Sequence, residues 1–285
     1  MAKTYHPKQL EKALRNLRAA FDGLTPLLSR VDAALAAGTT DSGAVESLVA
    51  EACAEARALA ATVHDQKMYL EWRIAPPPEW FDHFLDLYLQ WPRDGASLWL
   101  ERGVFGALAL RRGGRLLEMC CGDGFNSRHF YAPLVGSVLA VDFDGTALAH
   151  AGRYNTAANI SFRELDVRTG LPDGPFDNVT WDAAIEHFTE DEIATLLGGI
   201  HGVLAPDGIL SGYTVVERDD GGKHLEHHER EFRSMEDLVE ILSPHFREVT
   251  VFETVHPARH NLYFYAGDGS VPFAADWPGL RVRRR

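Results

Sequence analysis

Short apolar runs alternate with amphipathic segments of helical period over the second half of the chain, from Gly114 onward. A strand, a helix and a second strand in succession join parallel strands of one sheet, so this alternation constrains the fold most. It predicts a mostly parallel, doubly wound α/β sheet with helices on both faces. The expected strands are RLLEMCC, SVLAVDF, ISFREL, Asn178–Ile185 and GILSGYTVVE, and the expected helices follow Asn126 and cover GTALAHAGRYN and DEIATLLGGIHGVL.

The end of this region breaks the alternation. EVTVFETV and NLYFYAG are both strand-like, and no helical segment lies between them. Successive strands without a crossover pair antiparallel, so we expect a C-terminal antiparallel strand pair. Before this pair, Ser234 is placed to cap a helix over SMEDLVEILSPHF, with Asp237 three residues on in the manner of a capping box.

The first 66 residues carry a different period. Two series of apolar residues recur in alternating steps of four and three, the spacing of a heptad seam. They are Leu10, Leu14, Leu17, Phe21, Leu24, Leu28, Val31 and Leu35, and then Val45, Val49, Ala52, Ala56, Leu59 and Val63. With the loop AGTTDSG between them, they predict an antiparallel helical hairpin. Around Thr25 and Pro26 the first helix either kinks or gives way to a new one. The hairpin either covers the main domain or serves as a dimer or substrate-gripping element.

These patterns divide the chain into four parts. Residues 1–66 are the helical hairpin, 67–112 an aromatic-rich helical lid or connector, 113–268 the sheet domain and 269–285 a tail. The connector contains Trp72, Trp80, Trp91 and Trp99 and is broken by Pro76–Pro78. The tail ends in RVRRR, which we interpret as a frayed terminus and not as a binding arm.

Composition limits the partners. The 285 residues carry a net charge of -13, which disfavours nucleic acid as the main partner, because phosphate binding needs a basic face. No run approaches the roughly 18 apolar residues of a membrane span, and the N-terminus does not resemble a signal peptide. The three cysteines, Cys53, Cys120 and Cys121, are poorly placed to bridge, which indicates a reducing compartment. We therefore expect a cytoplasmic protein that does not act on membranes or nucleic acid.

The glycine turn in LLEMCCGDGFN, Leu116–Asn126, is the candidate ligand site. Ligands of open α/β sheets lie beyond the carboxyl ends of the strands, and glycine lets the backbone approach them closely. Acids surround this turn: Glu118 precedes it, Asp123 lies in it, and Asp142 ends the next strand, where a carboxylate can accept ribose hydroxyls. Acids repel a pyrophosphate and attract a cation. The expected ligand is therefore an adenosine that carries a cation, a description that S-adenosylmethionine fits.

LLEMCCGDG resembles the first motif of the class I S-adenosylmethionine-dependent methyltransferases, and the chain is most similar to those of the small-molecule type. The resemblance continues through VLAVDFD, ELDV, FDNVTWDAAIEHF and LAPDGIL to the closing strand pair, roughly Gly114–Gly267. It implies a Rossmann-like fold with S-adenosylmethionine as the cofactor. Cys120 departs from the family's frequent glycine, and its β carbon restricts the backbone dihedrals. Cys121 matches a frequent cysteine of the family and is expected to be a small buried residue.

The resemblance also implies roles for residues around the turn and strand four. Glu118 would orient the methionine end of the cofactor, and Gly122 and Gly124 would let the cofactor lie on the backbone. Trp181 and Asp182 would lie near the sulfonium.

Residues at the ends of strands two and three are implied to hold the adenosine. Asp142 would bind the ribose, with Phe143 packed on the adenine. Asp166 would take the adenine amino group, and the backbone of Val167 a ring nitrogen. The full expected cofactor-binding set is Glu118, Cys120, Gly122, Asp123, Gly124, Asp142, Phe143, Asp166, Val167 and Trp181.

Methyl transfer to a hydroxyl requires alignment of the reactants and removal of a proton, a role that suits histidine near neutral pH. His187 belongs to a Glu-His pair that resembles the EH pair of many small-molecule methyltransferases. His228, in HEREF, resembles another recurrent element of those enzymes. Each is a candidate base, and each is also open to interpretation as a packed or solvated residue. Asp182 is the third catalytic candidate, and Glu226 is a further alternative.

The histidine-rich stretch HLEHHERE raises the question of a metal. His224, His227 and His228 would share one face if this stretch were helical, and could then hold an ion. No cysteine or suitably spaced carboxylate clearly joins them, so we expect no metal.

These features predict an enzyme that methylates a small polar molecule, foremost the hydroxyl of a sugar or natural product. One alternative is N-methylation of an amine or a peptide, although TWDAA is not the proline-rich tetrapeptide often found in enzymes that methylate nucleic-acid or protein amines. Another is a non-catalytic, cofactor-binding partner that assembles through its N-terminal helices. The same helices could join two copies in a homodimer.

Overall fold

The computed structural model describes residues 6–72, 83–218, 220–257, 259–274 and 277. Parts of three predictions lie outside the described residues: Pro76–Pro78, Trp80 and the terminal Arg281–Arg285. The chain forms two compact units, residues 1–89 and 90–285. The boundary falls inside the expected connector, 67–112, which is therefore shared between the two units.

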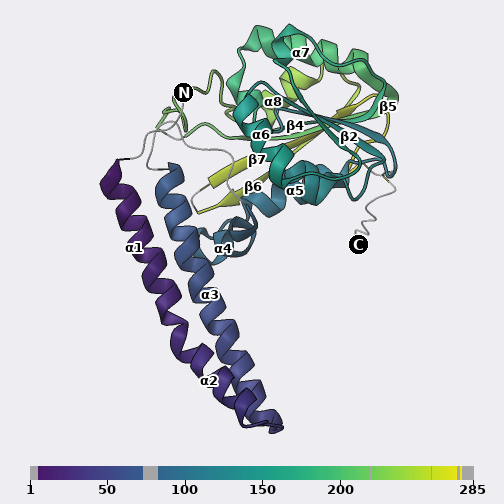
Figure 1. Ribbon diagram of the computed structural model, residues 1–285. Coiled ribbons are helices and arrows are strands. Elements are labelled where there is room, and N and C mark those ends of the chain that lie inside the picture. The colour runs from purple at the N-terminus through teal and green to yellow at the C-terminus, as the bar shows by residue number, and fades with distance from the viewer. Residues whose placement is uncertain (1–5, 73–82, 219, 258, 275–276, 278–285) are drawn as a thin grey trace, which may run out of the picture. The chain divides into compact units, whose positions relative to one another are not determined.

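The first unit is built around the predicted helical hairpin. Its helices are α1 (Pro7–Gly23), α2 (Thr25–Ala36) and α3 (Ser42–Trp72), followed by the start of α4 (Phe84–Asp94). Figure 1 shows α1 and α2 running alongside the single long helix α3. The chain starts a new helix at Thr25, with Pro26 in its first turn, and only Leu24, whose own backbone is helical, separates α1 from α2.

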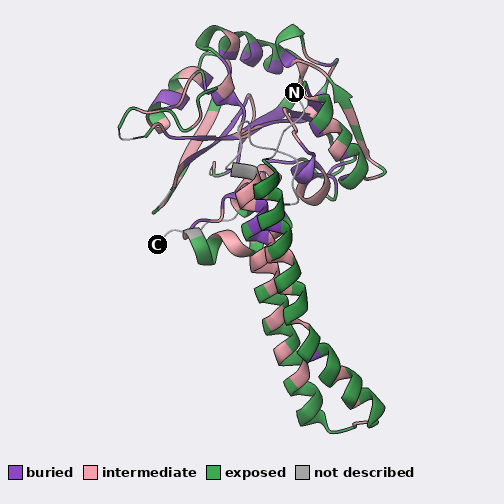
Figure 2. Ribbon diagram, turned by 60° about the vertical axis from the view of Figure 1, so that its left-hand side comes forward, coloured by how far each residue is buried: buried purple, intermediate pink, exposed green. Residues whose placement is uncertain are grey.

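Only half of the heptad seam on α1 and α2 is covered. Leu17, Leu24 and Val31 are half-buried, whereas the second row of the seam is exposed along its length. That row consists of Leu14, Phe21, Leu28 and Leu35, of which even the least exposed, Phe21, keeps 54% of its surface accessible. Exposed residues accordingly dominate the hairpin in Figure 2. An apolar row with regular spacing is thus left on the outer face of these two helices.

A buried polar cluster joins α3 to α4 within the first unit. The carboxylate of Asp86 contacts His64 Nε2 at 2.7 Å, His83 Nδ1 at 2.8 Å and the ammonium of Lys67. Burial alone would raise the pKa of Asp86, but the hydrogen bond from His83 and the Lys67 charge lower it to about 2. The cluster therefore keeps a carboxylate ionised inside this unit.

The second unit contains a seven-stranded sheet in the order β3-β2-β1-β4-β5-β7-β6. The strands β1 to β5 are parallel, and β7 pairs antiparallel with both β5 and β6. The bounds are β1 Arg115–Met119, β2 Ser137–Asp142, β3 Ile160–Glu164, β4 Phe176–Asp182, β5 Leu204–Val215, β6 Glu248–His256 and β7 Arg259–Gly267. The predicted doubly wound, mostly parallel sheet and its C-terminal antiparallel pair are both confirmed.

Helices cover the two faces of this sheet because alternate residues of the central strand point to opposite sides. Leu117 and Met119 of β1 belong to a core that includes residues of α7 (Glu190–Val203) and α8 (Met235–Leu242). Leu116 packs into the opposite core, together with the turn at Ser127–Tyr131. The remaining helices are α5 (Leu98–Leu108) and α6 (Gly145–Tyr154), drawn in Figure 1.

Three local details differ from the expected elements. Strand β4 spans Phe176–Asp182, and a short 3₁₀ turn follows at Ile185–His187, where the strand was expected to continue. The helix expected after Asn126 is a single π-helical turn. Ser234 caps α8 as expected, accepting from Asp237 N at 3.3 Å, but the Asp237 carboxylate accepts from Arg233 N and not from the cap residue. Within the described residues, no helix combines the length and apolarity needed to cross a membrane.

Candidate functional site

The carboxyl ends of three adjacent parallel strands define the site. Met119, the last residue of β1, lies opposite Val141 of β2 and Trp181 of β4. The segments that follow these strands therefore leave the sheet at the same level. This register brings the glycine turn, the acid at the end of β2 and the Glu186–His187 segment to one edge of the sheet.

The glycine turn is held in left-handed backbone conformations. Cys120, Gly122 and Gly124 have φ values of 55°, 53° and 71°. A β carbon on Gly124 would lie 2.7 Å from the ring of Phe162, whereas one on Gly122 would meet nothing within 4 Å. Gly124 thus serves close packing, and Gly122 leaves space beside the backbone for a ligand. Cys120 takes up a conformation that favours glycine, so the expected restriction of its dihedrals is a real cost at this position.

Glu118 lies beneath the turn with only 3% of its surface exposed. The hydroxyl of Ser127 donates to its Oε2. Burial raises the pKa of Glu118 to about 8, and the negative charge of Asp182 acts in the same direction. The carboxyl group is therefore largely protonated at neutral pH in this state.

The second acid of the turn region, Asp123, has a local structural role. Its Oδ1 accepts from Phe125 N at 3.0 Å, and its carbonyl accepts from Asn155 Nδ2 at 2.8 Å. These bonds tie the turn to the end of α6. Both predicted acids thus lie at the turn, with Glu118 under it and Asp123 shaping it.

Asp142 couples the end of β2 to the glycine turn. Its Oδ2 accepts from Gly122 N at 2.9 Å and its Oδ1 from Asp144 N at 2.8 Å. Burial raises its pKa, while these backbone hydrogen bonds oppose the rise. A carboxylate has about four acceptor positions, so ribose hydroxyls can add to these two bonds. Phe143 beside it is 67% exposed, which leaves a ring face available for packing.

The residues predicted at the ends of β3 and β4 differ in how they are placed. Asp166 Oδ1 accepts from Arg168 N at 3.0 Å and caps a short 3₁₀ turn, and Val167 is buried. Trp181 is fully buried, with its ring centroid 5.3 Å from that of Phe188. The indole of Trp181 thus packs in the core beneath the carboxyl ends of the strands, and its expected place near the sulfonium stays a prediction.

Asp182 is engaged in an ion pair that the sequence did not suggest. Its Oδ2 accepts from Arg102 Nε at 2.7 Å and from Asn126 Nδ2 at 3.1 Å. The guanidinium of Arg102 lies over the ring of Trp99, 4.4 Å from its centroid. Because Asp182 is held between two donors, it is better suited to positioning these groups than to accepting a proton.

Next to this ion pair lies a small polar cavity. It is bounded by α5, β4, β5 and β7, with Arg102 and Asp182 in its lining, and it has room for about one water molecule. Three hydroxyls that line it, those of Tyr131, Thr180 and Ser211, are buried and have no hydrogen-bond partner among the described residues. The cavity therefore offers polar atoms that are able to bond to a polar guest.

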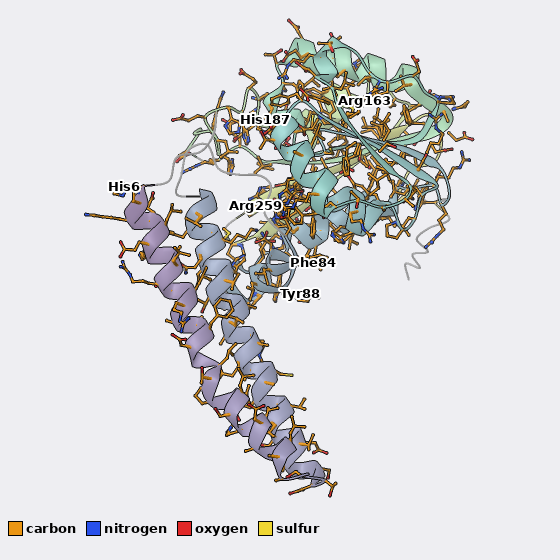
Figure 3. The ribbon with its side chains drawn as sticks, viewed as in Figure 1. His6, Phe84, Tyr88, Arg163, His187 and Arg259 are labelled. Carbon is orange, nitrogen blue, oxygen red and sulfur yellow. The ribbon has the colours of Figure 1, made fainter. Side chains whose placement is uncertain are left out.

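The two histidines expected to be catalytic lie together. The rings of His187 and His228 are 4.8 Å apart between centroids, and His187 also stacks on His227 at 4.9 Å (Figure 3 labels His187). His228 Nδ1 contacts the buried carboxylate of Glu231. Burial lowers the pKa of His187 to about 4, helped by the charges of the other two histidines. His187 is therefore neutral at physiological pH.

The histidine-rich stretch is not helical, so the arrangement in which His224, His227 and His228 would share a helix face does not occur. A different group comes together: Glu186, His187 and His228 each offer a ligand-type atom, and these atoms lie within 4.8 Å of one another. Glu186 precedes His187 in the sequence, and His228 arrives from the loop after β5.

Comparison with known proteins agrees with this geometry. Residues 116–208 match a family model described as a methyltransferase domain. These residues contain the glycine turn, the acids after β1, β2 and β3, and the Glu186–His187 segment. The match shows a methyltransferase domain over these residues, and the strand order with its closing antiparallel pair agrees with the fold of the class I S-adenosylmethionine-dependent methyltransferases.

Individual relatives match only parts of the chain. An uncharacterized methyltransferase of Synechocystis sp., sll0829, is 28% identical over 104 residues, which are 36% of this chain and 48% of that protein. The chain thus spans about half the length of this curated relative. Among solved structures, N-methyltransferase NodS from Bradyrhizobium japonicum WM9 with S-adenosyl-L-homocysteine is 19% identical, covering 62% of this chain and 90% of its own, with a TM-score of 0.49. A DhpI complex with S-adenosylhomocysteine is 24% identical, covers 54% and 76% of the two chains and has a TM-score of 0.44.

We predict that Asp142→Ala weakens binding of S-adenosylmethionine at least about tenfold, or about 1.4 kcal/mol. The substitution removes the expected ribose acceptor and the bond that fixes Gly122. Isothermal titration would measure the affinity, with Asp142→Asn as a variant that keeps the size and one acceptor oxygen. Asp191→Ala, an exposed acid on α7, is the control and should bind as the unaltered protein does. Unchanged affinity in Asp142→Ala would exclude this placement of the ribose.

Proposed function

We propose that this protein transfers the methyl group of S-adenosylmethionine to a small polar molecule, foremost to a hydroxyl of a sugar or natural product. The observation that carries the proposal is the histidine pair, His187 and His228, on the same sheet edge as the cofactor-type turn. A base is useful when the acceptor is a hydroxyl, because the oxygen must lose its proton as it attacks.

The proposed reaction is an in-line displacement. The acceptor oxygen forms a bond to the methyl carbon while the carbon–sulfur bond breaks and S-adenosylhomocysteine leaves. The proton of the hydroxyl passes to the histidine pair. Fixed strand ends and a rigid turn suit this reaction, since most of its acceleration comes from holding the reactants in line. N-methylation of an amine or a peptide is the alternative; a neutral amine attacks with its own lone pair and does not depend on the histidines.

We also propose that Glu118 loses its proton when the positively charged cofactor binds. Its pKa of about 8 means that it is mostly protonated at pH 7. A bound ammonium or sulfonium favours the carboxylate and lowers this pKa, so binding at pH 7 should release up to about one proton from Glu118. The release should vanish well above pH 8, where the group is already ionised.

Titration calorimetry at pH 7 in buffers of different ionisation enthalpy measures this release. We expect the observed heat to depend on the buffer, because each released proton is taken up by a buffer molecule. In Glu118→Gln this dependence should be smaller, since the proton from Glu118 is no longer released. The variant keeps the size of the side chain. The buffer dependence that remains in it reports the protons that the ligand itself gains or loses. Equal buffer dependence in the two proteins would contradict the proposal.

Turnover tests the histidine pair. His187→Ala and His228→Ala should each lower methyl transfer to the acceptor by about 10²–10⁴-fold, the usual effect of losing the group that handles the proton. Affinity for S-adenosylmethionine should stay the same, and the melting temperature would reveal a merely structural loss. His201→Ala, remote at the end of α7 and paired with Asp268, is the control. Near-normal turnover in both histidine variants would point to an acceptor that needs no base, whereas no turnover in the unaltered protein would point to a non-catalytic protein.

We also propose that the exposed apolar row on α1 and α2 joins two copies of the chain. Leu14, Phe21, Leu28 and Leu35 repeat every seven residues, the period with which helices pack against each other. A two-fold axis along this row would let each copy cover the other's apolar residues.

Light scattering coupled to size-exclusion chromatography should therefore give twice the chain mass of 31.6 kDa. Replacing Leu14 and Leu28 by lysine should return a monomer, because it puts charges into the proposed interface. Replacing the exposed Glu46 and the partly exposed Glu55 of α3 by lysine, which alters the charge without touching the row, should leave the dimer intact. A monomeric unaltered protein at micromolar concentration would exclude the interface.

A further inference from the structure

Glu186 lies beside the two histidines, His187 and His228, and forms a compact group with them. One carboxylate and two imidazoles come from two separate segments, and one ligand-type atom of each lies within 4.8 Å of the others. Glu186 and His228 are buried and His187 is partly exposed, so the group has one accessible side.

Backbone hydrogen bonds fix the two segments to each other. The carbonyl of Glu186 accepts from Glu229 N at 2.8 Å and from Arg230 N at 3.1 Å. These two residues directly follow His228 in the loop after β5. These two hydrogen bonds fix the loop to the backbone of Glu186, so His228 is held next to Glu186 and His187. Ligands on an anchored backbone meet the first requirement of a metal site, which is a fixed geometry.

Each histidine is also oriented through its other ring nitrogen. His228 Nδ1 contacts Oε1 of Glu231, whose side chain is only 2% exposed. His187 Nδ1 lies 3.4 Å from the carbonyl oxygen of His227. If Nδ1 carries the hydrogen and donates it in both cases, Nε2 of each ring keeps its lone pair. Metal-binding histidines almost always show this arrangement, with a carboxylate or a carbonyl behind the imidazole.

Glu186 completes the set from inside the protein. The hydroxyl of Thr214, on β5, donates to its Oε2 at 3.0 Å. A carboxylate that accepts one hydrogen bond keeps further acceptor positions, and the bond from Thr214 orients the group. All three candidate ligands therefore have a supporting partner that orients the side chain.

We propose that Glu186, His187 and His228 bind one divalent transition-metal cation. Two imidazoles and one carboxylate suit Zn²⁺ and neighbouring first-row ions, and three protein ligands leave positions open for another molecule. Ligand atoms about 2.0–2.2 Å from one ion lie about 3–4 Å apart, so the group needs to close by only about 1 Å.

This inference deepens the proposed function and, in one respect, rests on it. A hydroxyl bound to such an ion becomes more acidic, as water does on zinc. The ion would then take the acceptor oxygen at an open position and lower the pKa of the hydroxyl. With the ion bound, His187 and His228 would act as ligands in place of bases, and the proton would pass to solvent. The binding of the ion itself does not depend on which acceptor the protein methylates.

The test is metal binding by the full, untagged chain after removal of metals with a chelator and subsequent removal of the chelator. Calorimetric titration with Zn²⁺ or Mn²⁺, without S-adenosylmethionine or acceptor, should reveal one site per chain. Co²⁺ should give a visible absorption spectrum typical of nitrogen and oxygen ligands. No saturable binding of any of the three ions would overturn the proposal.

Variants assign the site. Glu186→Gln keeps the shape of the buried side chain and should weaken the ion at least tenfold, and His228→Ala should do the same. His201→Ala, which removes a remote exposed histidine, should bind as the unaltered protein does. Folding is checked by the melting temperature, and Glu186→Gln keeps the test valid should His228→Ala not fold. Equal affinity in Glu186→Gln and the unaltered protein would overturn the proposal.

Turnover separates this inference from the proposed function. Metal-free protein that binds S-adenosylmethionine normally but methylates its acceptor at least tenfold more slowly, with recovery on adding the ion, would support the role in proton loss. Full turnover of the metal-free protein would overturn that role. Binding of the ion by a protein without any methyl transfer would uphold the site and reject the proposed function.

Discussion

The parallel register of β1 between β2 and β4 is the constraint on which the site depends. Met119 lies opposite Val141 on one side and Trp181 on the other. A slip of β1 by one residue would move each of its side chains from one core to the other, so the packing of the apolar cores on the two faces of the sheet fixes this register. The glycine turn, Asp142 and the Glu186 segment meet at one edge because hydrophobic side chains far from that edge hold the strands in place.

A concentration of acids at this edge is the main electrostatic feature. Glu118, Asp142, Asp182 and Glu186 are largely buried, and burial raises the pKa of three of them, Glu118, Asp142 and Glu186. Arg102 compensates part of this charge through its ion pair with Asp182. Buried acids are costly in an empty site and become favourable when a positive ligand arrives. A sulfonium with an ammonium, or a metal ion, is the kind of ligand that such an edge stabilises.

Local patterns predicted most of the sheet domain, since strand and helix periods are properties of neighbouring residues. The turn and the acids at the strand ends were predictable for the same reason: each follows directly from a strand. Contacts between distant segments were not. Arg102 lies 80 positions from Asp182, and nothing in the sequence around either residue links them. The contact of His228 with Glu231 is local, but its approach to Glu186 depends on how the loop after β5 folds back. The burial of Trp181 against Phe188 was not predictable either, because strand position does not reveal which face a side chain occupies.

The hydrogen bonds and ion pairs of these side chains decide which of them can accept a proton from an acceptor hydroxyl. Asp182 is held by Arg102 and Asn126, and removing its charge would leave a buried guanidinium without its partner, which is costly. Glu118 is buried under the turn, receives the hydroxyl of Ser127 and is itself mostly protonated near pH 7. The histidine pair is different, because His187 is neutral and partly exposed and His228 is oriented by Glu231. Among these groups, His187 is thus the one with both the lone pair and the access that a hydroxyl acceptor requires.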